Sequence, residues 1–241
     1  MEVKDVLKLV MPIVETERLT LRPVCLEDAE DMYAYCSDDE VLKYLWFEKH
    51  DSVEFTHYII DKLFLNRIDV GMLEAYAIVL KESKRMIGTI DVNQVYFNEV
   101  GVIGYVIHRD HWGKGLVLEA LEALIPVLFH HCGFYRLEIN HCADNMASGR
   151  VIEKAGFILE GRFRKRKKER DGHRAASLYY GLSKVDEPAL HRYGKEKYKK
   201  TTTKLKESLQ NMTNKWSDAD YFSLEKNEKA QNYFENATSE K

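Results

Sequence analysis

The residues best suited to chemistry are two glycines that flank a lysine, within the stretch HRDHWGKGLVLEALEAL at 108–124. The preceding residues, VIGYVI, are rich in β-branched side chains and predict a buried strand, and the following residues predict an apolar helix. Gly113 and Gly115 therefore fall in a strand–turn–helix junction, where backbone N–H groups and the positive end of a helix dipole converge. Such a junction favours an anion, and a phosphate or pyrophosphate is the expected ligand.

Two common nucleotide sites do not fit this turn. A P-loop needs a serine or threonine after Gly-Lys to hold magnesium, whereas Gly115 follows Lys114 here. A dinucleotide fold needs G-x-G-x-x-G, and GKGLVL supplies only the first two glycines. An ordinary turn between a strand and a helix without a ligand is the remaining alternative.

Hydrophobic periodicity predicts the elements that position this turn. The predicted strands are 18–24, 73–80, 85–97, 100–107 and 134–142, and the predicted helices are 25–45, 52–67, 116–131 and 145–157. Ser52 is the expected N-cap of the second helix, and Pro126 should kink the third because its ring removes a backbone hydrogen bond. Gly156 should end the fourth helix in a left-handed conformation, and Asp171-Gly172 should turn a final hairpin.

Composition restricts the class of protein. Of 241 residues, 45% are apolar, which indicates a globular chain, and the net charge of −3 argues against a general nucleic-acid binder. The four cysteines form no C-x-x-C pair, which suits a reducing compartment. Charged residues interrupt the apolar N-terminal run, and no apolar run reaches the roughly 18 residues of a membrane span. A soluble, cytoplasmic protein with no membrane partner is expected.

The character of the chain changes near Pro188, so we predict a domain at 1–188 and a C-terminal extension at 189–241. The extension is lysine-rich, with fewer aliphatic residues. Leu205, Leu209, Met212 and Trp216 fall at helical spacing, which predicts a partly helical segment. This segment could dock on the domain, close over the substrate mouth, or form the contact of a homodimer.

Two stretches, IGYVIHRDHWGKGLVLEALEALIPVLF and YRLEINHCADNMASGRVIEKAGFILEGRFR, carry a GY strand, a WGKG turn, EAL, N-x-x-S and E-K-x-G-F in that order. Together they resemble the GNAT superfamily of acetyl-CoA-dependent N-acetyltransferases, and within it the ribosomal-protein alanine N-acetyltransferases of the RimJ/RimL type. The resemblance covers about residues 15–185. It implies an α/β (α+β) GNAT fold, in which a central mixed, mostly antiparallel sheet splays between the two strands that hold acetyl-CoA, with helices on both faces.

The resemblance also implies where the coenzyme binds. The implied pyrophosphate contacts are the backbone N–H groups of Trp112, Gly113, Lys114, Gly115, Leu116 and Val117. Strand 102–107 would splay from strand 136–140 and pair with the pantetheine arm through Val106 and Ile107, with Asn140 also at the coenzyme. A backbone N–H at Val106 or Ile107 would steady the oxyanion of the tetrahedral intermediate.

Asn145 and Ser148 match the N-x-x-S motif, which implies that Asn145 bonds the pantetheine amide and Ser148 the departing thiolate. Both residue types are also common helix caps, so capping is the alternative role. Val117 stands where the family usually has a small residue, and Lys114 is expected to point to solvent near the phosphates.

The implied reaction is direct attack of a primary amine on the thioester, without a covalent enzyme intermediate. A lysine amine has a pKa of about 10.4 and an α-amine has a pKa of about 8, so both are mostly protonated near neutral pH. Because an ammonium group cannot attack, a base or a water chain must take the proton. Many relatives carry a Glu two residues before the GY pair, and some carry a Tyr seven residues after the motif Asn. Val102 and Ile152 stand at those positions here.

The candidate catalytic residues are therefore Ser148, Asp91 and Glu99, with His108 and Glu138 as further substitutes for the missing base. Each strand carboxylate has a simpler interpretation as a solvated side chain. His108 has the most suitable intrinsic pKa for a base, but it sits at the strand end near the phosphate turn.

The acceptor stays open at this point. A protein N-terminal amine is what the subfamily resemblance implies, and a small amine such as an antibiotic or a polyamine is the alternative. The missing Glu and Tyr also fit a non-catalytic module that binds acetyl-CoA for interaction alone. Turnover of acetyl-CoA with some amine separates an enzyme from such a module.

Two further patterns receive simple interpretations. The HHC at 130–132 and HC at 141–142 match no standard zinc ligand set, so no metal is expected. The basic run RFRKRKKER at 162–170 could contact an acidic partner such as ribosomal RNA, or it could be a solvated hairpin arm. The domain itself is expected to need no nucleic acid.

Replacing Gly115 with glutamate is expected to abolish acetyl-CoA binding, because a negative side chain would occupy the position of the pyrophosphate. Titration calorimetry with acetyl-CoA compares the wild type and the variant. Normal binding by Gly115→Glu would show that the pyrophosphate lies elsewhere.

Overall fold

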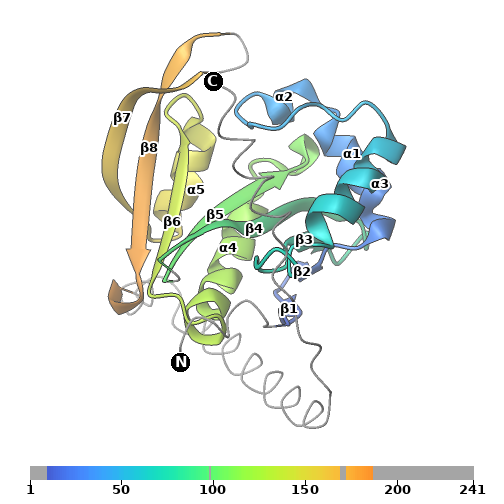
Figure 1. Ribbon diagram of the computed structural model, residues 1–241, viewed down its shortest axis with the longest axis horizontal. Coiled ribbons are helices and arrows are strands. Elements are labelled where there is room, and N and C mark those ends of the chain that lie inside the picture. The colour runs from blue at the N-terminus through green and yellow to red at the C-terminus, as the bar shows by residue number, and fades with distance from the viewer. Residues whose placement is uncertain (1–9, 98, 169–171, 187–241) are drawn as a thin grey trace.

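The computed structural model describes residues 10–97, 99–168 and 172–186. Their strands form one eight-stranded sheet in the order β1-β2-β3-β4-β5-β6-β8-β7. The strands are β1 Val14–Glu15, β2 Leu19–Pro23, β3 Tyr76–Leu80, β4 Met86–Tyr96, β5 Val100–Ile107, β6 Arg136–Cys142, β7 Ile158–Lys168 and β8 Arg174–Ser183. Figure 1 shows the long β7–β8 hairpin at one end of the molecule and α1, α2 and α3 at the other.

Every neighbouring pair of strands is antiparallel except β5 and β6, which run parallel. The β4–β5 ladder extends from Gly88, opposite Ile107, to Tyr96, opposite Val100. Gly88 permits this close pairing, since a Cβ there would lie 2.2 Å from the Val106 carbonyl oxygen. The mixed, mostly antiparallel sheet predicted from the sequence is confirmed.

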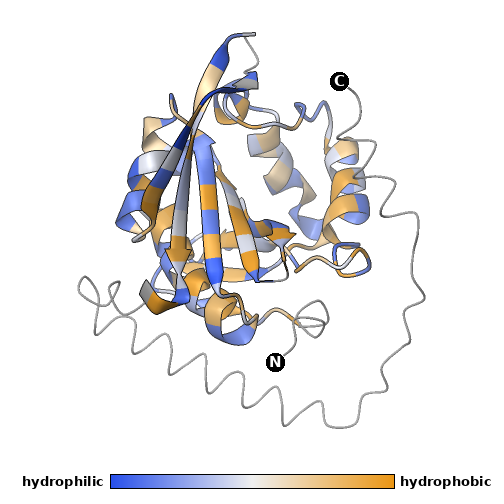
Figure 2. Ribbon diagram, turned by 60° about the vertical axis from the view of Figure 1, so that its left-hand side comes forward, coloured by the Kyte–Doolittle hydropathy of each residue, from blue (hydrophilic) through white to orange (hydrophobic). Residues whose placement is uncertain are grey.

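Helices cover both faces of the sheet, as predicted. The helices are α1 Ala29–Cys36, α2 Asp39–Leu42, α3 Val53–Ile59, α4 Leu116–Pro126 and α5 Met146–Lys154, and the short 3-10 or π turns are η2 Leu26–Asp28, η3 Ile60–Phe64, η4 Arg109–His111, η5 Val127–His131 and η6 Lys184–Asp186. The larger apolar cluster packs α4 and α5 against the sheet, and a second cluster packs α1 against β3. Strands in Figure 2 carry alternating hydrophilic and hydrophobic bands, as a sheet covered in this way requires.

Two helices that the sequence predicted as continuous are interrupted. The range 25–45 forms η2, α1 and α2, because the Asp38 side chain accepts the Glu40 N–H at 3.0 Å and caps a new helix. In the range 52–67, Ser52 caps α3 as predicted, accepting the Phe55 N–H at 3.1 Å. The helix then widens into the π turn η3. The periodicity therefore predicted a helical segment correctly, but the regular α-helix is shorter than the predicted range 52–67.

The predicted breaks at proline and glycine are found. The α-helical part of α4 ends at Pro126, and the chain continues as the π turn η5. Gly156 and Gly172 both have a φ of 89°, the left-handed conformation that glycine adopts without strain. The expected extension at 189–241, its apolar stripe and Asp171 lie outside the described residues. Within the described ranges, no helix has the length and apolar character needed to cross a membrane.

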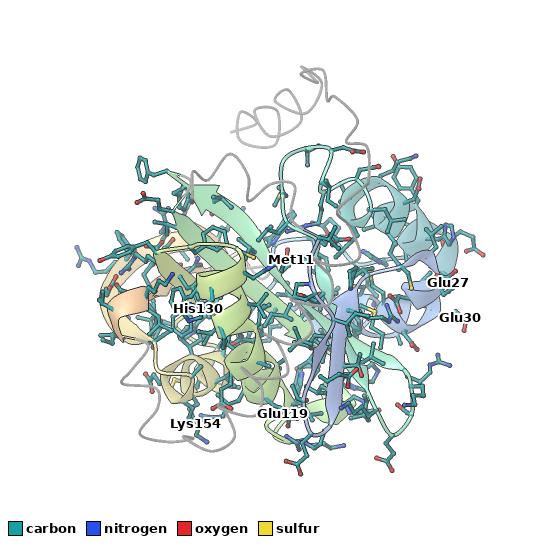
Figure 3. The ribbon with its side chains drawn as sticks, turned by 90° about the horizontal axis from the view of Figure 1, so that it is seen from below. Met11, Glu27, Glu30, Glu119, His130 and Lys154 are labelled. Atoms are coloured by element: carbon teal, nitrogen blue, oxygen red, sulfur yellow. The ribbon has the colours of Figure 1, made fainter. Side chains whose placement is uncertain are left out.

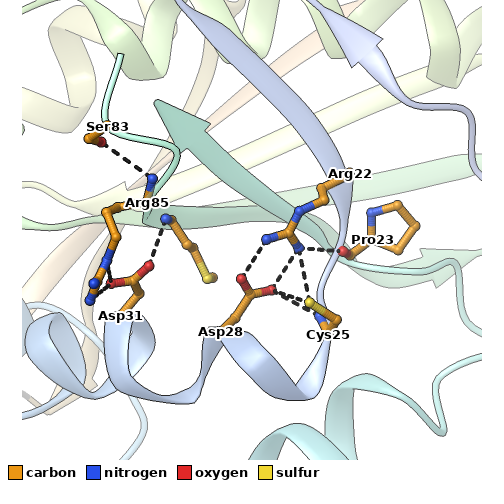
Figure 4. Close-up of polar contacts among 8 residues, drawn as sticks. Arg22, Pro23, Cys25, Asp28, Asp31, Ser83 and Arg85 are labelled. Carbon is orange, nitrogen blue, oxygen red and sulfur yellow. Dashed lines mark hydrogen bonds and ion pairs between the residues drawn. The ribbon is translucent and has the colours of Figure 1, made fainter. Parts of the chain in front are cut away.

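A buried ion pair fastens the first helical layer to the sheet. The Arg22 guanidinium of β2 donates to both carboxylate oxygens of Asp28, at 2.8 and 2.6 Å, and Asp28 also accepts the Cys25 N–H (Figure 4). Asp28 is only 3% exposed. The bond to Asp28 raises the pKa of Arg22 above its usual value. This paired charge fixes where the chain leaves the sheet and enters α1.

Replacing Asp28 with alanine should lower the free energy of unfolding by about 3 kcal/mol, because it leaves the partly buried Arg22 guanidinium without its partner. Urea titration measures the loss. Lys49→Ala is the matched control, since it removes the exposed Lys49–Asp39 pair and should cost less than about 0.5 kcal/mol. Equal losses for both variants would contradict a structural role for the buried pair.

Candidate active site

The centre of the candidate site is the divergence of β5 and β6. Their parallel pairing covers only Val100–Arg136, Gly101–Leu137 and Val102–Glu138. Beyond these residues, β5 pairs on one side with β4, and β6 pairs on its other side with β8. The later parts of β5 and β6 therefore border an opening in the sheet, as the family resemblance implied for strands 102–107 and 136–140, although the opening begins only after Val102 and Glu138.

The glycine turn lies where β5 leads into α4. Gly113 and Gly115 have φ values of 72° and 74°, so both need a residue that adopts the left-handed region. A Cβ at Gly113 would meet nothing within 4 Å, and one at Gly115 would meet only the Arg18 Nη2, at 3.8 Å. The glycines are therefore required by backbone conformation, and the space beside them is open.

Other residues of the turn leave its backbone accessible. Gly115 is the N-cap of α4 and has no side chain to bond the first N–H groups of the helix, so the cap leaves those groups open to an anion. The Trp112 indole N–H donates to the Ile107 carbonyl at 3.0 Å, which holds the turn against the end of β5. Leu116 and Val117 are buried, so they can offer only backbone atoms, and Lys114 is exposed as predicted.

A tyrosine of β5 and a serine of α5 contact each other beside the opening. The Tyr105 hydroxyl of β5 lies 2.5 Å from the Ser148 Oγ of α5, and 3.3 Å from the Ser148 carbonyl oxygen. Burial raises the pKa of Tyr105 to about 12, so its hydroxyl keeps its proton near neutral pH. Two neutral hydroxyls, one of them with a protected proton, therefore lie together on the α5 side of the opening.

Asn145 caps α5 in this structure. Its Oδ1 accepts the Ser148 N–H at 3.1 Å, which is the capping role named as the alternative in the sequence analysis. This bond also sets the position of Ser148. Asn140 is exposed near the end of β6, opposite Tyr179 of β8 and beyond the residues of β6 that pair with β5.

Below the first turns of α5 lies a buried histidine. His141 is 8% exposed, its Nδ1 lies 2.7 Å from the Cys142 carbonyl oxygen, and its ring stacks on Tyr180 at 5.5 Å. A carbonyl can only accept, so Nδ1 carries the proton and Nε2 has a free lone pair when the ring is neutral. That Nε2 would lie 3.0 Å from a Cβ at Gly149, so the glycine makes room for the ring beneath α5. Burial lowers the pKa of His141.

On the opposite face of the sheet, Asp91 pairs with an arginine. Asp91 lies opposite Gly104 in the β4–β5 ladder, and its Oδ2 is 2.8 Å from the Arg67 Nη1. Arg67 also donates to the Leu73 and Val92 carbonyls, so the guanidinium is held rigidly. Burial raises the pKa of Asp91, and the charge of Arg67 opposes that shift. The carboxylate is thus a partly buried group beside the middle of β5.

The other proposed carboxylates are placed less favourably. Glu99 is exposed in the turn between β4 and β5, at the opposite end of β5 from the glycine turn. Glu138 lies beside Val102 on the neighbouring strand, and its carboxylate accepts the Arg136 Nε at 2.8 Å. His108 caps η4 by accepting the Asp110 N–H at 3.2 Å. The structure therefore brings Ser148 and Asp91 near the opening but not Glu99.

Sequence reasoning missed two residues of this arrangement. Tyr105 was part of the GY motif but received no role; strand alternation from Ile103 would have placed it on the face toward α4 and α5. Arg67 gave no local signal, because it lies in the turn segment after η3 and its partner lies 24 positions away on β4. Among the described residues, no group of three or more histidine, cysteine or acidic side chains is arranged to hold a metal.

Known proteins similar to this chain are acetyltransferases. Residues 18–158 match the family model of the acetyltransferase (GNAT) domain. The uncharacterized N-acetyltransferase p20 of Bacillus licheniformis is 34% identical over 156 residues, which are 64% of this chain and 86% of that protein. The ribosomal-protein-serine acetyltransferase of Escherichia coli (strain K12) is 32% identical over 102 residues, 42% of this chain and 56% of that protein.

Solved structures share the fold. RimL, a ribosomal L7/L12 alpha-N-protein acetyltransferase solved with coenzyme A, has a TM-score of 0.64 and 21% identity, covering 73% of this chain and 98% of RimL. The microcin C7 self-immunity acetyltransferase MccE, solved with acetyl-CoA and AMP, has a TM-score of 0.61 and 20% identity, covering 70% of this chain and 93% of MccE. At these identities the likeness concerns the fold, and the bound ligands are consistent with acetyl-CoA as the donor.

The buried His141 should make the protein less stable below about pH 6.5. Its pKa is lower when folded, so the unfolded chain binds more protons below that pH, and stability falls as the pH drops toward the folded-state pKa. Urea titrations of wild type and His141→Phe at pH 7.5 and 5.5 measure this contribution. The variant should lose less stability between the two pH values, and an identical loss would contradict the assignment.

Proposed function

The chain belongs to the GNAT acetyltransferase family, and we propose that it transfers the acetyl group of acetyl-CoA to a protein N-terminal amine. The observation that carries the proposal is the opening between β5 and β6, with two left-handed glycines where β5 leads into α4. The opening offers unpaired strand edges to an extended arm, and the turn offers backbone N–H groups to an anion. Acetyl-CoA has both parts, a pantetheine arm and a diphosphate.

We assign the diphosphate to the backbone of the turn at 112–117, with Gly113 and Gly115 allowing its close approach. The pantetheine arm would run along Val106 and Ile107, whose backbone borders the opening. Asn145 contributes to donor binding by fixing the start of α5 through its cap. In this proposal Asn145 acts on the coenzyme through the position of Ser148.

The reaction needs a neutral amine, a stabilised oxyanion and a protonated leaving group. The amine nitrogen bonds to the thioester carbon, and the backbone N–H of Ile107 in β5 would stabilise the resulting oxyanion, since the N–H of Val106 faces Thr89 of β4. The carbon–sulfur bond then breaks, and the thiolate takes a proton to leave as coenzyme A. The amine must give its own proton to a base.

We propose Asp91 as that base, reached directly or through water. It lies opposite Gly104, beside the middle of β5, and burial raises its pKa, which favours proton uptake. Arg67 holds the carboxylate in place and limits the rise of its pKa. Glu99 receives no role, because it is exposed at the far end of β5.

We propose that Ser148 gives the proton to the departing thiolate and that Tyr105 replaces it. The two hydroxyls lie 2.5 Å apart, so a proton can pass from Tyr105 to Ser148 as Ser148 donates. Burial raises the pKa of Tyr105 to about 12, so the tyrosine is protonated before the transfer and regains a proton from water after it. This pair supplies a proton donor in place of the tyrosine that some relatives carry at the position of Ile152.

The acceptor class rests on the relatives. The similar proteins with assigned acceptors include the ribosomal-protein-serine acetyltransferase of E. coli, which supports a protein substrate. A small amine is the second candidate, because proteins that share one fold can act on unrelated acceptors. Acetyl-CoA-dependent thiol release with peptides bearing free N-termini, with polyamines and with aminoglycosides distinguishes them. Turnover on peptides alone supports the proposal, and turnover only on a small amine contradicts it.

Replacing Ser148 with alanine should lower kcat by about 100-fold, because the thiolate loses its proton donor, while the KM for acetyl-CoA stays nearly unchanged. Tyr105→Phe should cost less, since the serine hydroxyl remains. Thiol release at saturating acceptor measures both variants. An Ser148→Ala enzyme with normal kcat would remove Ser148 from the mechanism.

A further inference from the structure

A buried glutamate joins the first turn of α4 to the turn between β1 and β2. Glu119 is 7% exposed and accepts four hydrogen bonds or charged contacts from Thr16 and Arg18. Its Oε1 accepts the Thr16 hydroxyl at 2.6 Å and the Arg18 N–H at 2.9 Å, and its Oε2 accepts the Arg18 Nε at 2.7 Å. Figure 3 shows Glu119 on α4 beside the N-terminal strands.

The same arginine reaches the glycine turn. The Arg18 Nη1 donates to the Lys114 carbonyl oxygen at 2.9 Å, between the two left-handed glycines. One edge of the Arg18 guanidinium therefore bonds the Glu119 carboxylate, and another edge bonds the Lys114 carbonyl in the turn. A planar fork can satisfy both partners at once, which the single ammonium of a lysine does less well.

This contact sets the direction of one peptide group. The described chain has no cis peptide bond, so the Lys114 carbonyl and the Gly115 N–H point in opposite directions. A carbonyl drawn toward Arg18 sends the Gly115 N–H away from the β1–β2 turn. Without this bond, Gly115 would let the peptide group rotate, because glycine adopts either sign of φ easily.

We propose that Arg18 is a positioning residue for the donor diphosphate, acting through the Lys114 carbonyl to aim the Gly115 N–H at the phosphate. The inference rests on the proposed placement of the diphosphate in this turn. Glu119 fixes the position of Arg18, so one ion pair connects the N-terminal strands and α4 to the proposed coenzyme site. The bond lowers the freedom of the turn before the coenzyme arrives, which favours binding.

The test compares coenzyme A with pantetheine, which has the same arm and thiol but no diphosphate. For Arg18→Lys and Arg18→Gln, we expect the Kd for coenzyme A to rise about tenfold and that for pantetheine to change less than about twofold. Calorimetric titration measures coenzyme A, and competition measures pantetheine. Equal weakening for both ligands, or an Arg18→Lys protein that binds coenzyme A normally, would overturn the proposal.

Thr16→Val is the matched control for stability. It removes another donor to the same buried carboxylate but leaves the Arg18 contact with the Lys114 carbonyl. We expect it to lower the melting temperature and to leave the coenzyme A Kd within about twofold of the wild type. If Thr16→Val weakens binding as much as Arg18→Lys, the effect comes from stability and the proposal is wrong.

A separate outcome tests the premise. A wild-type protein that binds coenzyme A no more tightly than pantetheine would contradict the placement of the diphosphate, and with it the proposed function of the turn. A wild-type preference for coenzyme A over pantetheine that is unchanged in Arg18→Lys would contradict the role of Arg18 alone.

Discussion

The short parallel pairing of β5 and β6 is the constraint on which the site depends. Parallel strands joined through α4 are held together at their first residues, and each is then kept by an antiparallel neighbour on its outer side. The two outer ladders diverge, so the inner edges separate and leave backbone groups that need another partner. A substrate arm that completes these edges gains hydrogen bonds that the protein alone does not make. The opening is therefore a consequence of sheet topology rather than of any one side chain.

The N-terminal ends of two helices position candidate functional groups at that opening, both from the same face of the sheet. The start of α4 brings the glycine turn to the end of β5, and the start of α5 brings Ser148 to Tyr105. The carboxylate of Asp91 approaches from the other face, where it is paired with Arg67 from the segment that follows η3. In the proposed mechanism, the sheet separates Ser148 and Tyr105, which donate a proton, from Asp91, which accepts one. In that mechanism, the amine gives its proton to a residue on one face of the sheet and the thiolate receives a proton from the other face, so the two steps use different residues.

Local signals in the sequence predicted much of this arrangement. The turn at Gly113 and Gly115, the cap at Ser52 and the left-handed Gly156 follow from short-range rules, and the structure has all three. The break at Asp38 was missed because helical periodicity continues through it, while a side-chain cap decides the boundary. Arg67 could not be found, because only tertiary packing brings it to Asp91. Local rules predict conformation, whereas partners distant in the chain need the fold itself.

The link between Arg18 and Glu119 has a consequence for how the molecule assembles. The two residues are 101 positions apart, so their contact closes a very long loop. Contacts of that separation form slowly, after the local helices and hairpins. During synthesis, β1 and β2 emerge early and cannot complete their environment until α4 has been made. The glycine turn, which Arg18 contacts at the Lys114 carbonyl, is therefore among the last parts of the fold to acquire its final shape, although its own sequence is contiguous.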